Sequence, residues 1–322
     1  MPTGASASAA DAGGLFGRRL LFVTGKGGTG KTSIAAAIAL AASRTGRRVL
    51  AVEMDAKGSL PTMLGAARAG YEPVAVAPNL SVMSMDTESS LREYLRIHLR
   101  IPFVARLGPL AGVFDFVAAA APGVKEILGV GKVAWEVREQ RWDLVVVDSE
   151  ASGHVVSQIA SPRVINRLVP GGPLASQTTW MLDILEDPAR TGVVVVSTTE
   201  ELAVTETTSL VDRLRNETGT SLAAVVVNRT DTPVDPAIVE LVADLDERGI
   251  DADRRAALAV VRGAIARAEE ARTALTDLTS IAGSALVFVI PDLVAIDPDD
   301  ASIVSSIAEI LALPSDSDSE SA

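Results

Sequence analysis

A run of small and cationic residues near the amino terminus carries the clearest chemical signal in this sequence. Residues 25–32 read Gly-Lys-Gly-Gly-Thr-Gly-Lys-Thr, which has the spacing of a phosphate-binding loop. An apolar segment, Leu20–Thr24, precedes the run, and an alanine-rich segment, Ser33–Ser43, follows it. Glycines allow successive backbone N–H groups to curl around phosphate oxygens at the start of a helix. We therefore predict a strand, a loop and a helix that together bind the phosphates of a nucleotide.

The side chains of this run have separate expected roles. The expected nucleotide-binding residues are those of the run, Gly25, Lys26, Gly27, Gly28, Thr29, Gly30, Lys31 and Thr32, and Ser33 directly after it. Lys31 should reach the β- and γ-phosphates, and Thr32 should offer its hydroxyl group to Mg²⁺. ATP and Mg²⁺ are thus the expected cofactors. The alternative is a glycine-rich turn that binds no ligand.

A second candidate is the carboxylate that ends the apolar run Asp143–Asp148. The carboxyl ends of parallel strands open toward the ligand crevice of an α/β sheet, so Asp148 should face the phosphate loop. We expect it to hold Mg²⁺ through water, because Mg²⁺ keeps much of its hydration shell. Capping of the next helix is the alternative. Gly153 and His154 come shortly afterwards, and this glycine could let the loop close on a γ-phosphate and reopen after hydrolysis.

The elements that position these residues follow from the hydrophobic pattern. Short apolar runs alternate with longer segments of helical period, which predicts an α/β fold with a mostly parallel central sheet flanked by helices. The expected strands are Leu20–Thr24, Val49–Glu53, Leu80–Met85, Asp143–Asp148, Val193–Ser197, Ala223–Asn228 and Ala285–Ile290. The expected helices include Ser33–Ser43, Glu200–Asn216 and Asp253–Thr276. Residues from about 87 to 141 are too many for one crossover helix and are predicted to form a helical insert.

The predicted organisation is a single ATPase domain of the P-loop type over residues 18–313, including the insert. A disordered tail is expected over residues 1–17, and an acidic disordered tail over residues 314–322. The first seventeen residues are rich in Ala, Ser and Gly, and the basic pair Arg18 and Arg19 follows them. A secretory signal has the opposite order, so we expect a cytoplasmic protein.

Composition excludes several classes of function. None of the 322 residues is cysteine, which removes disulfides, cysteine-ligated zinc and thiol nucleophiles. The net charge of -12 argues against binding to nucleic acid or to an anionic membrane surface. No apolar run approaches the roughly 18 residues that a spanning helix needs. We therefore expect no nucleic-acid partner and no direct membrane insertion.

Lys26 gives the run a resemblance to a known motif. A lysine directly after the first glycine resembles the deviant Walker A motif, which belongs to the ATPase class that includes ParA, MinD, the nitrogenase iron protein and ArsA. In that class this lysine reaches across a dimer interface to the nucleotide of the other subunit. The resemblance implies a catalytic Lys26 and a nucleotide-sandwich dimer, either a homodimer or a heterodimer with a paralogue. A solvated loop lysine is the alternative.

Residues 148–154 narrow the resemblance to the ArsA and tail-anchored-protein-targeting (guided entry) ATPase family. They read Asp-Ser-Glu-Ala-Ser-Gly-His, and the second switch of that family typically reads Asp-Thr-Ala-Pro-Thr-Gly-His. Asp148, Gly153 and His154 match, whereas Glu150 and Ala151 replace Ala and Pro. The resemblance implies that Gly153 and His154 belong to a switch. A hydrogen-bonded histidine at a helix start is an equal alternative for His154.

Three further positions extend the resemblance over most of residues 20–312. Asp55 resembles the aspartate of the family's first switch and would position the attacking water, although the Pro and His of that switch are missing. Asn228 and Pro291 stand where the class places residues that contact adenine. A helix cap is the alternative for Asp55, and ordinary turn chemistry is the alternative for the other two.

The resemblance implies an ATP-hydrolysing dimeric switch that engages an unknown protein partner or client through the helical insert. Because the sequence contains no cysteine, we expect neither arsenite-binding thiols nor a CxxC zinc clasp. Because it contains one phosphate loop, we do not expect the duplicated arrangement of the pump ATPase. One alternative is a positioning ATPase like MinD or ParA, against which the net charge argues. A regulatory subunit that holds ATP and cleaves it weakly is another, and a small-molecule kinase is the least supported.

Overall fold

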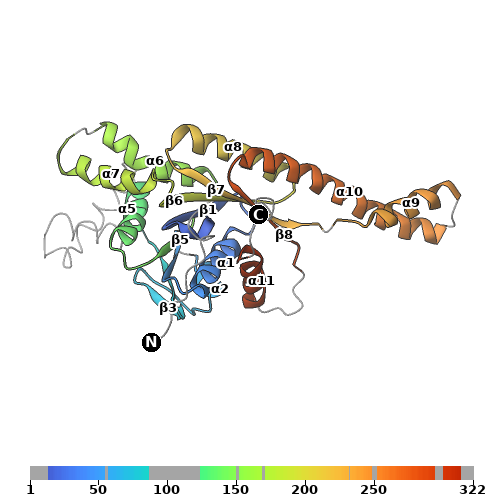
Figure 1. Cartoon of the computed structure of the whole chain (residues 1–322), viewed down its shortest axis with the longest axis horizontal. Helices are drawn as coiled ribbons and strands as arrows, with labels where there is room; N and C mark the ends of the chain where they lie inside the picture. The colour runs from blue at the N-terminus through green and yellow to red at the C-terminus, as the bar shows by residue number, and fades with distance from the viewer. Residues whose placement is uncertain are drawn as a thin grey trace, which may run out of the picture.

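The body of the molecule is built on one eight-stranded sheet (Figure 1). The computed structural model describes residues 14–54, 57–86, 124–149, 152–168, 171–231, 233–248, 252–293 and 300–312. The strands are β1 (Leu20–Gly25), β2 (Val49–Glu53), β3 (Val74–Ala77), β4 (Leu80–Ser84), β5 (Leu144–Asp148), β6 (Thr191–Ser197), β7 (Ser221–Thr230) and β8 (Leu286–Pro291). Their order is β3-β4-β2-β5-β1-β6-β7-β8. Every pair is parallel except the edge pair β3–β4, which confirms the predicted fold class.

All the expected strands are present, and each end lies within about two residues of its predicted place. The additional strand, β3, was not predicted. It is only four residues long, and its side chains are partly or fully exposed at the edge of the sheet. It therefore lacks the buried apolar run by which the other strands are recognised.

Helices cover both faces of the sheet. They are α1 (Lys31–Arg44), α2 (Ser59–Met63), α5 (Val124–Arg138), α6 (Ser152–Leu168), α7 (Gly172–Leu185), α8 (Glu201–Glu217), α9 (Pro236–Arg248), α10 (Ala252–Ala282) and α11 (Asp300–Ala312). On β1, Leu21 and Val23 face the core shared with α1 and α11, while Leu20 and Phe22 face the core shared with α5 to α8. This alternation follows from the two-residue period of a strand and produces the layered α/β arrangement.

The structure describes part of the predicted amino-terminal tail and none of the predicted carboxyl-terminal tail. Leu15–Gly17 form a short 3-10 helix in which Leu15 is buried against the core, so the predicted tail over residues 1–17 extends too far. Outside the described residues lie 1–13, 87–123 and 313–322. The predicted acidic tail over residues 314–322 therefore stays a prediction. The described end of the insert is α5. Its Val130, Val133 and Ala134 are buried in the core beneath the sheet.

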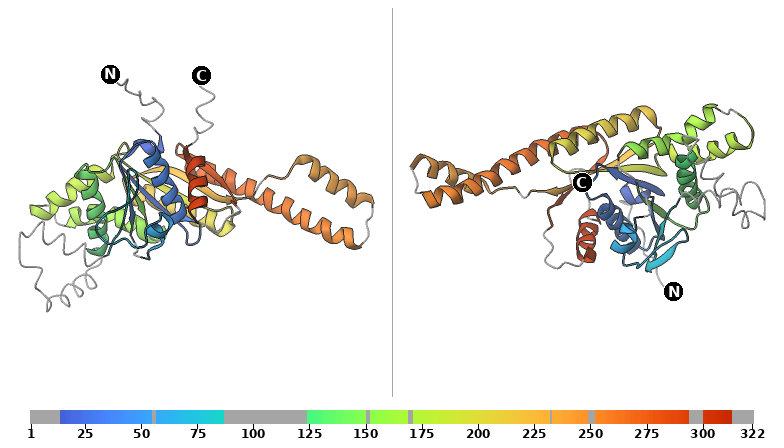
Figure 2. Two further views of the ribbon diagram at one scale, coloured as in Figure 1. Left: turned by 90° about the horizontal axis from the view of Figure 1, so that it is seen from below. Right: turned by 180° about the vertical axis from the view of Figure 1, so that it is seen from behind.

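A helical arm leaves the body between β7 and β8 (Figure 2). It consists of α9 and α10, and α10 alone has 31 residues, which at 1.5 Å per residue is about 46 Å. Leu278 and Ala282 at its carboxyl end pack on β7, but Val260 and Leu241 farther out are 72% and 55% exposed. The helix predicted over Asp253–Thr276 is confirmed. The projection was not predicted, because helical period does not say what a helix packs against.

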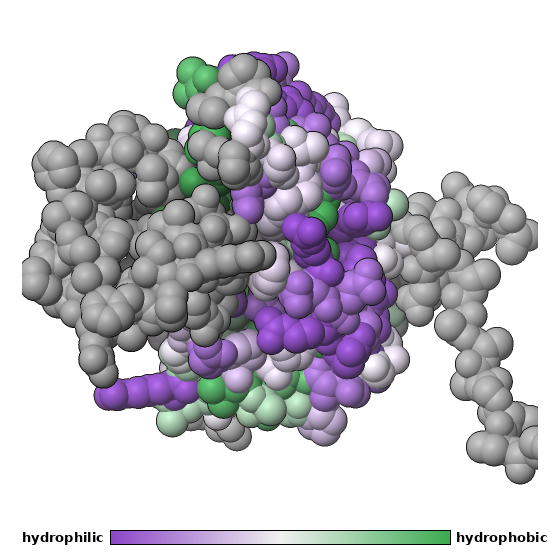
Figure 3. Space-filling view, turned by 90° about the vertical axis from the view of Figure 1, so that its left-hand side faces the viewer, coloured by the Kyte–Doolittle hydropathy of each residue, from purple (hydrophilic) through white to green (hydrophobic). Residues whose placement is uncertain are grey.

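The side of the molecule formed by α5 to α7 is mostly hydrophilic where described residues are visible, with small hydrophobic areas near the upper and lower edges of the view (Figure 3). Two exposed apolar side chains of this side belong to α6, where Val164 is 52% and Leu168 is 75% exposed. Among the helices within the described ranges, none combines the length and the hydropathy needed to cross a bilayer.

Candidate nucleotide-binding site

The predicted phosphate loop connects β1 to α1 at the carboxyl edge of the sheet. Gly25, Gly28 and Gly30 have φ angles of 147°, 87° and 91°, all in the region that side chains disfavour. At Gly25 there is a second constraint, because a methyl group there would overlap the carbonyl oxygen of Val196 on β6. The glycines are therefore required by the path of the backbone, which agrees with the interpretation of the run as a cradle for an anion.

Replacing Gly25 by alanine is expected to destabilise the ligand-free protein by about 2 kcal/mol or more, because the new methyl group strains φ and clashes with β6. Gly27 is the matched control, since a Cβ atom there meets no atom within 4 Å. Gly27→Ala should leave the melting temperature almost unchanged. Thermal unfolding of both variants without nucleotide checks this, and equal melting temperatures would contradict it.

The carbonyl of Lys26 organises the inside of the loop. It accepts hydrogen bonds from the Thr29 hydroxyl at 3.0 Å and from Nζ of Lys31 at 3.2 Å. Burial lowers the pKa of Lys31, the positive charge of Lys57 lowers it further, and Asp148 acts in the opposite direction. Cations thus gather around this loop although the chain as a whole is acidic, and a bound polyphosphate would favour the charged form of each.

Asp148 ends β5 beside this loop, as predicted. Burial raises its pKa to about 6, and the neighbouring Glu53 raises it too. A hydrogen bond from the Thr32 hydroxyl and the charges of Lys31 and Lys57 act in the opposite direction. Asp148 is 8% exposed, so this carboxylate sits in a largely dry place, close to Thr32 at the amino end of α1.

The residues at this edge of the sheet suit a hydrated Mg²⁺ ion. Thr32 and Asp148, the predicted metal residues, are in direct contact, and the Ser149 hydroxyl next to them is buried without a hydrogen-bond partner. Within the described parts of the chain, no group of three or more His, Asp or Glu side chains could hold a metal ion by itself. The hydroxyl of Thr32 and the carboxylate of Asp148 are oxygen donors, which suit Mg²⁺ as an ion that keeps water and phosphate oxygens among its ligands.

Asn228 and Pro291, predicted to contact adenine, lie at the ends of β7 and β8 on the same edge of the sheet. Asn228 is buried, and its amide donates to the carbonyl oxygen of Thr29 at 2.8 Å. The guanidinium of Arg229 donates to the carbonyl oxygen of Gly28 at 3.5 Å. Asn228 therefore ties the phosphate loop to β7. Pro291 is exposed and pairs with Thr230, and the predicted adenine contact of both residues stays a prediction.

The two predicted switches are only partly visible. Gly153 and His154 are exposed in the first turn of α6, which places them after the end of β5 and Asp148. Asp55, Glu150 and Ala151 lie outside the described residues. Their predicted roles stay predictions.

Sequence reasoning missed Glu53 and Lys57. Both influence the pKa of Asp148 through their charges, so both belong to the site. The available signal was their position on either side of Asp55, inside the segment that resembles the first switch. The roles expected from the resemblance fell on Asp55, and neither Glu53 nor Lys57 was given one.

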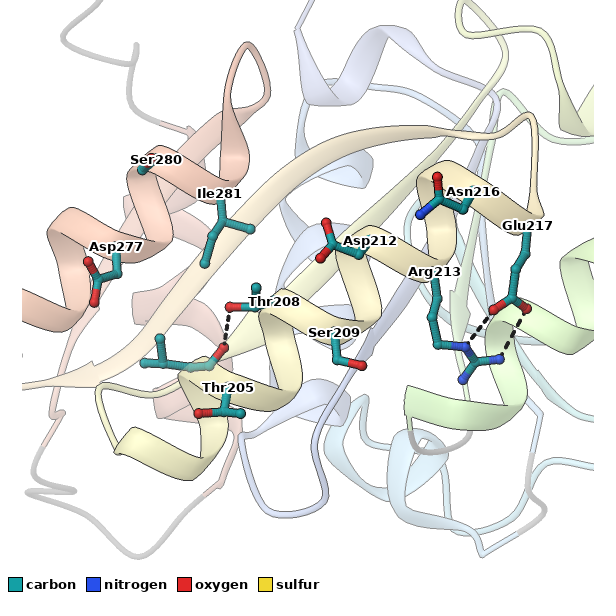
Figure 4. A pocket seen from close by; sticks show the side chains of 11 residues that line it. Thr205, Thr208, Ser209, Asp212, Arg213, Asn216, Glu217, Asp277, Ser280 and Ile281 are labelled. Carbon is teal, nitrogen blue, oxygen red and sulfur yellow. Dashed lines mark hydrogen bonds and ion pairs between the residues drawn. The ribbon is translucent and has the colours of Figure 1, made fainter.

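A separate cavity of about 710 Å³ lies between α8 and α10 (Figure 4). Its rim carries the ion pair between Arg213 and Glu217, with Nε and Oε1 2.8 Å apart. Because α8 covers the face of the sheet opposite to α1, this cavity is not part of the phosphate-binding site.

The mostly parallel sheet and the glycine loop between β1 and α1 agree with the fold of the P-loop NTPases. Residues 18–170 match the family model of the anion-transporting ATPases. This match agrees with the resemblance to the ArsA and tail-anchored-protein-targeting ATPases found in the sequence.

Individual relatives agree with this family. The chain is 29% identical to ATPase BagA of Mycobacterium tuberculosis over 226 residues. The aligned part covers 67% of this chain and 66% of that protein. It is 30% identical over 173 residues to ATPase get3 of Schizosaccharomyces japonicus, which covers 50% of this chain and 52% of that protein. It is 28% identical over 172 residues to ATPase GET3 of Mycosarcoma maydis, which covers half of each. The chain therefore spans about two thirds or less of these relatives.

Proposed function

We propose that this protein is a Mg-ATP-dependent dimeric switch ATPase. The observation that carries the proposal is the meeting of Lys31, Thr32 and Asp148 at one edge of the sheet, beside a glycine loop whose path only glycines can follow. The family supports an ATPase. The dimer, the use of Mg²⁺ and the engagement of a partner are parts of the proposal.

In the proposed reaction, the N–H groups of the loop bind the β- and γ-phosphates. Lys31 exchanges its hydrogen bond with the Lys26 carbonyl for one with the phosphates. Mg²⁺, when bound near Thr32 and Asp148, neutralises phosphate charge. Asp55 orients the attacking water, because phosphoryl transfer needs a positioned nucleophile more than covalent help.

The second subunit supplies the remaining cation. Lys26 of each chain neutralises charge on the nucleotide of the other chain, as an arginine finger does in other ATPases. Closure and reopening of the pair would move Gly153 and His154 and change the grip of the helical insert on a protein client in the cytoplasm. The companion chain is a second copy or a paralogue.

Turnover per chain is expected to rise with protein concentration and then level off, because a site formed by two chains is complete only in the dimer. Steady-state ATPase assays over a hundredfold range of concentration measure this, together with the mass of the protein bound to Mg²⁺ and a non-hydrolysable triphosphate. A chain that stays monomeric under these conditions, alone and with its paralogue, would contradict the dimer. If the chain binds ATP and cleaves none in a single turnover, a nucleotide-holding subunit becomes the better description.

A further inference from the structure

The last residue of β2, Glu53, carries a carboxylate that the proposed reaction does not use. Its side chain is only 3% exposed. In the register of the sheet it lies opposite Asp148 on β5 and opposite Ser84 on β4. Burying a carboxylate costs free energy of folding unless hydrogen bonds satisfy it. The groups that donate to Glu53 therefore indicate what the side chain does.

Three donors satisfy this carboxylate. The backbone N–H of Gly58 lies 3.0 Å from Oε2, and the backbone N–H of Leu60 lies 3.1 Å from Oε1. The hydroxyl of Ser84 donates to Oε2 at 2.8 Å. Because both oxygens are taken and two of the donors are backbone groups just downstream, Glu53 fastens the segment between β2 and α2 to the sheet.

The described residues of this segment lie beside Asp148 and the phosphate loop. It begins at Met54, whose N–H donates to the carbonyl oxygen of Asp148 at 3.1 Å. It ends at Gly58, and Lys57 immediately before it is the residue whose charge acts on Lys31 and Asp148. Asp55 belongs to the same stretch of sequence, although it lies outside the described residues.

We propose that Glu53 is a positioning residue of the ATPase reaction, which holds the segment after β2 at Gly58 and Leu60 and so keeps Lys57 beside the phosphate loop. A free carboxylate next to a polyphosphate would repel it, whereas one whose oxygens accept three hydrogen bonds is partly neutralised and can serve as an anchor. This inference rests on the proposed ATPase function.

Glu136 provides a matched control for testing the anchor. Like Glu53 it is buried, at 1% exposure, and it accepts from three side chains, those of Lys132, Arg141 and Trp142. Trp142 precedes β5, so this carboxylate lies toward the opposite edge of the sheet from Asp148. Changing Glu136 to Gln therefore disturbs a comparable buried acid without touching the phosphate site.

The anchor is tested first without nucleotide, by limited digestion with trypsin and mass analysis of the fragment that ends at Lys57. Glu53→Gln should increase cleavage after Lys57 by about tenfold, since an amide has one acceptor oxygen and turns an NH₂ group toward an N–H donor. Glu136→Gln should leave this cleavage unchanged. Ser84→Ala, which removes one donor, should raise it by a smaller factor and replaces Glu53→Gln if that variant does not fold.

The effect on the reaction is then read from steady-state ATPase kinetics. Glu53→Gln should lower kcat by about tenfold with less than a twofold change in KM for ATP, and Glu136→Gln should keep the original kcat. Unchanged cleavage, unchanged kcat, or an equal loss of kcat in both variants would overturn the positioning role. Absence of hydrolysis by the unaltered chain would overturn the proposed function instead. The cleavage result alone would then decide whether Glu53 anchors the segment.

Discussion

Lys26→Ala is expected to reduce ATP turnover by at least about a hundredfold and to leave ATP binding within a few-fold of the unaltered protein. A cation placed on the transferring phosphoryl group is worth about 10³ to 10⁵ in rate in related reactions, and part of that loss should appear here. The contribution of residue 26 to the loop is made by its carbonyl oxygen, which accepts from Thr29 and Lys31 and is kept by alanine. Turnover and equilibrium binding of a fluorescent ATP analogue measure the two effects separately.

Lys31→Ala is the comparison variant, because its ammonium group lies within the loop and its loss should weaken ATP binding itself by at least about tenfold. A mixing experiment then shows in which chain Lys26 acts. Chains with Lys26→Ala and chains with Asp55→Ala, each nearly inactive, should recover activity when mixed, since the first kind keeps Asp55 and receives Lys26 from the second. Absence of recovery, with both kinds binding ATP and pairing normally, would place Lys26 in its own chain's site.

Much of the fold and the centre of the site could be predicted because they depend on local sequence. The glycines of the loop, the strand before them and the helix after them are consecutive, so spacing alone identifies them. Asp148 could be predicted for a similar reason. A charged residue that ends a buried apolar run of a parallel sheet lies at the carboxyl edge, where ligands bind.

The features that could not be predicted depend on which distant segments meet. Asn228 donates to Thr29, 199 residues away, and no local pattern announces such a bond. Glu53 was visible only as the end of a predicted strand, and its hydrogen bonds with the backbone of Gly58 and Leu60 appear only in the folded chain. The arm of α9 and α10 has an ordinary helical period, and its projection follows from the absence of a sheet beneath most of it (Figure 2).

Asp148→Asn is expected to make the nucleotide-free protein more stable at pH 7.5 while abolishing most Mg²⁺-dependent turnover. The folded pKa of about 6 lies above the ordinary value of 3.8, so the folded state holds the proton more tightly. Stability is therefore lost as the pH rises from about 4 to about 6, and above that range the ionised carboxylate costs up to about 3 kcal/mol. Asparagine keeps the shape without the charge. Denaturant unfolding should show the gain at pH 7.5 and little difference at pH 4.

Asp143, just before the other end of β5, is the control with the opposite sign. Its hydrogen bonds with Arg48 hold its pKa at about 2, below the ordinary value, so its contribution to stability is present above about pH 4 and is lost as the pH falls toward 2. Asp143→Asn should therefore lower stability at pH 7.5 and keep ATP turnover. If both variants shifted stability in the same direction, burial of Asp148 in a dry site would be the wrong explanation. Opposite shifts would mean that the chain accepts a less stable fold in order to keep a buried carboxylate at the site proposed for a hydrated cation and a triphosphate.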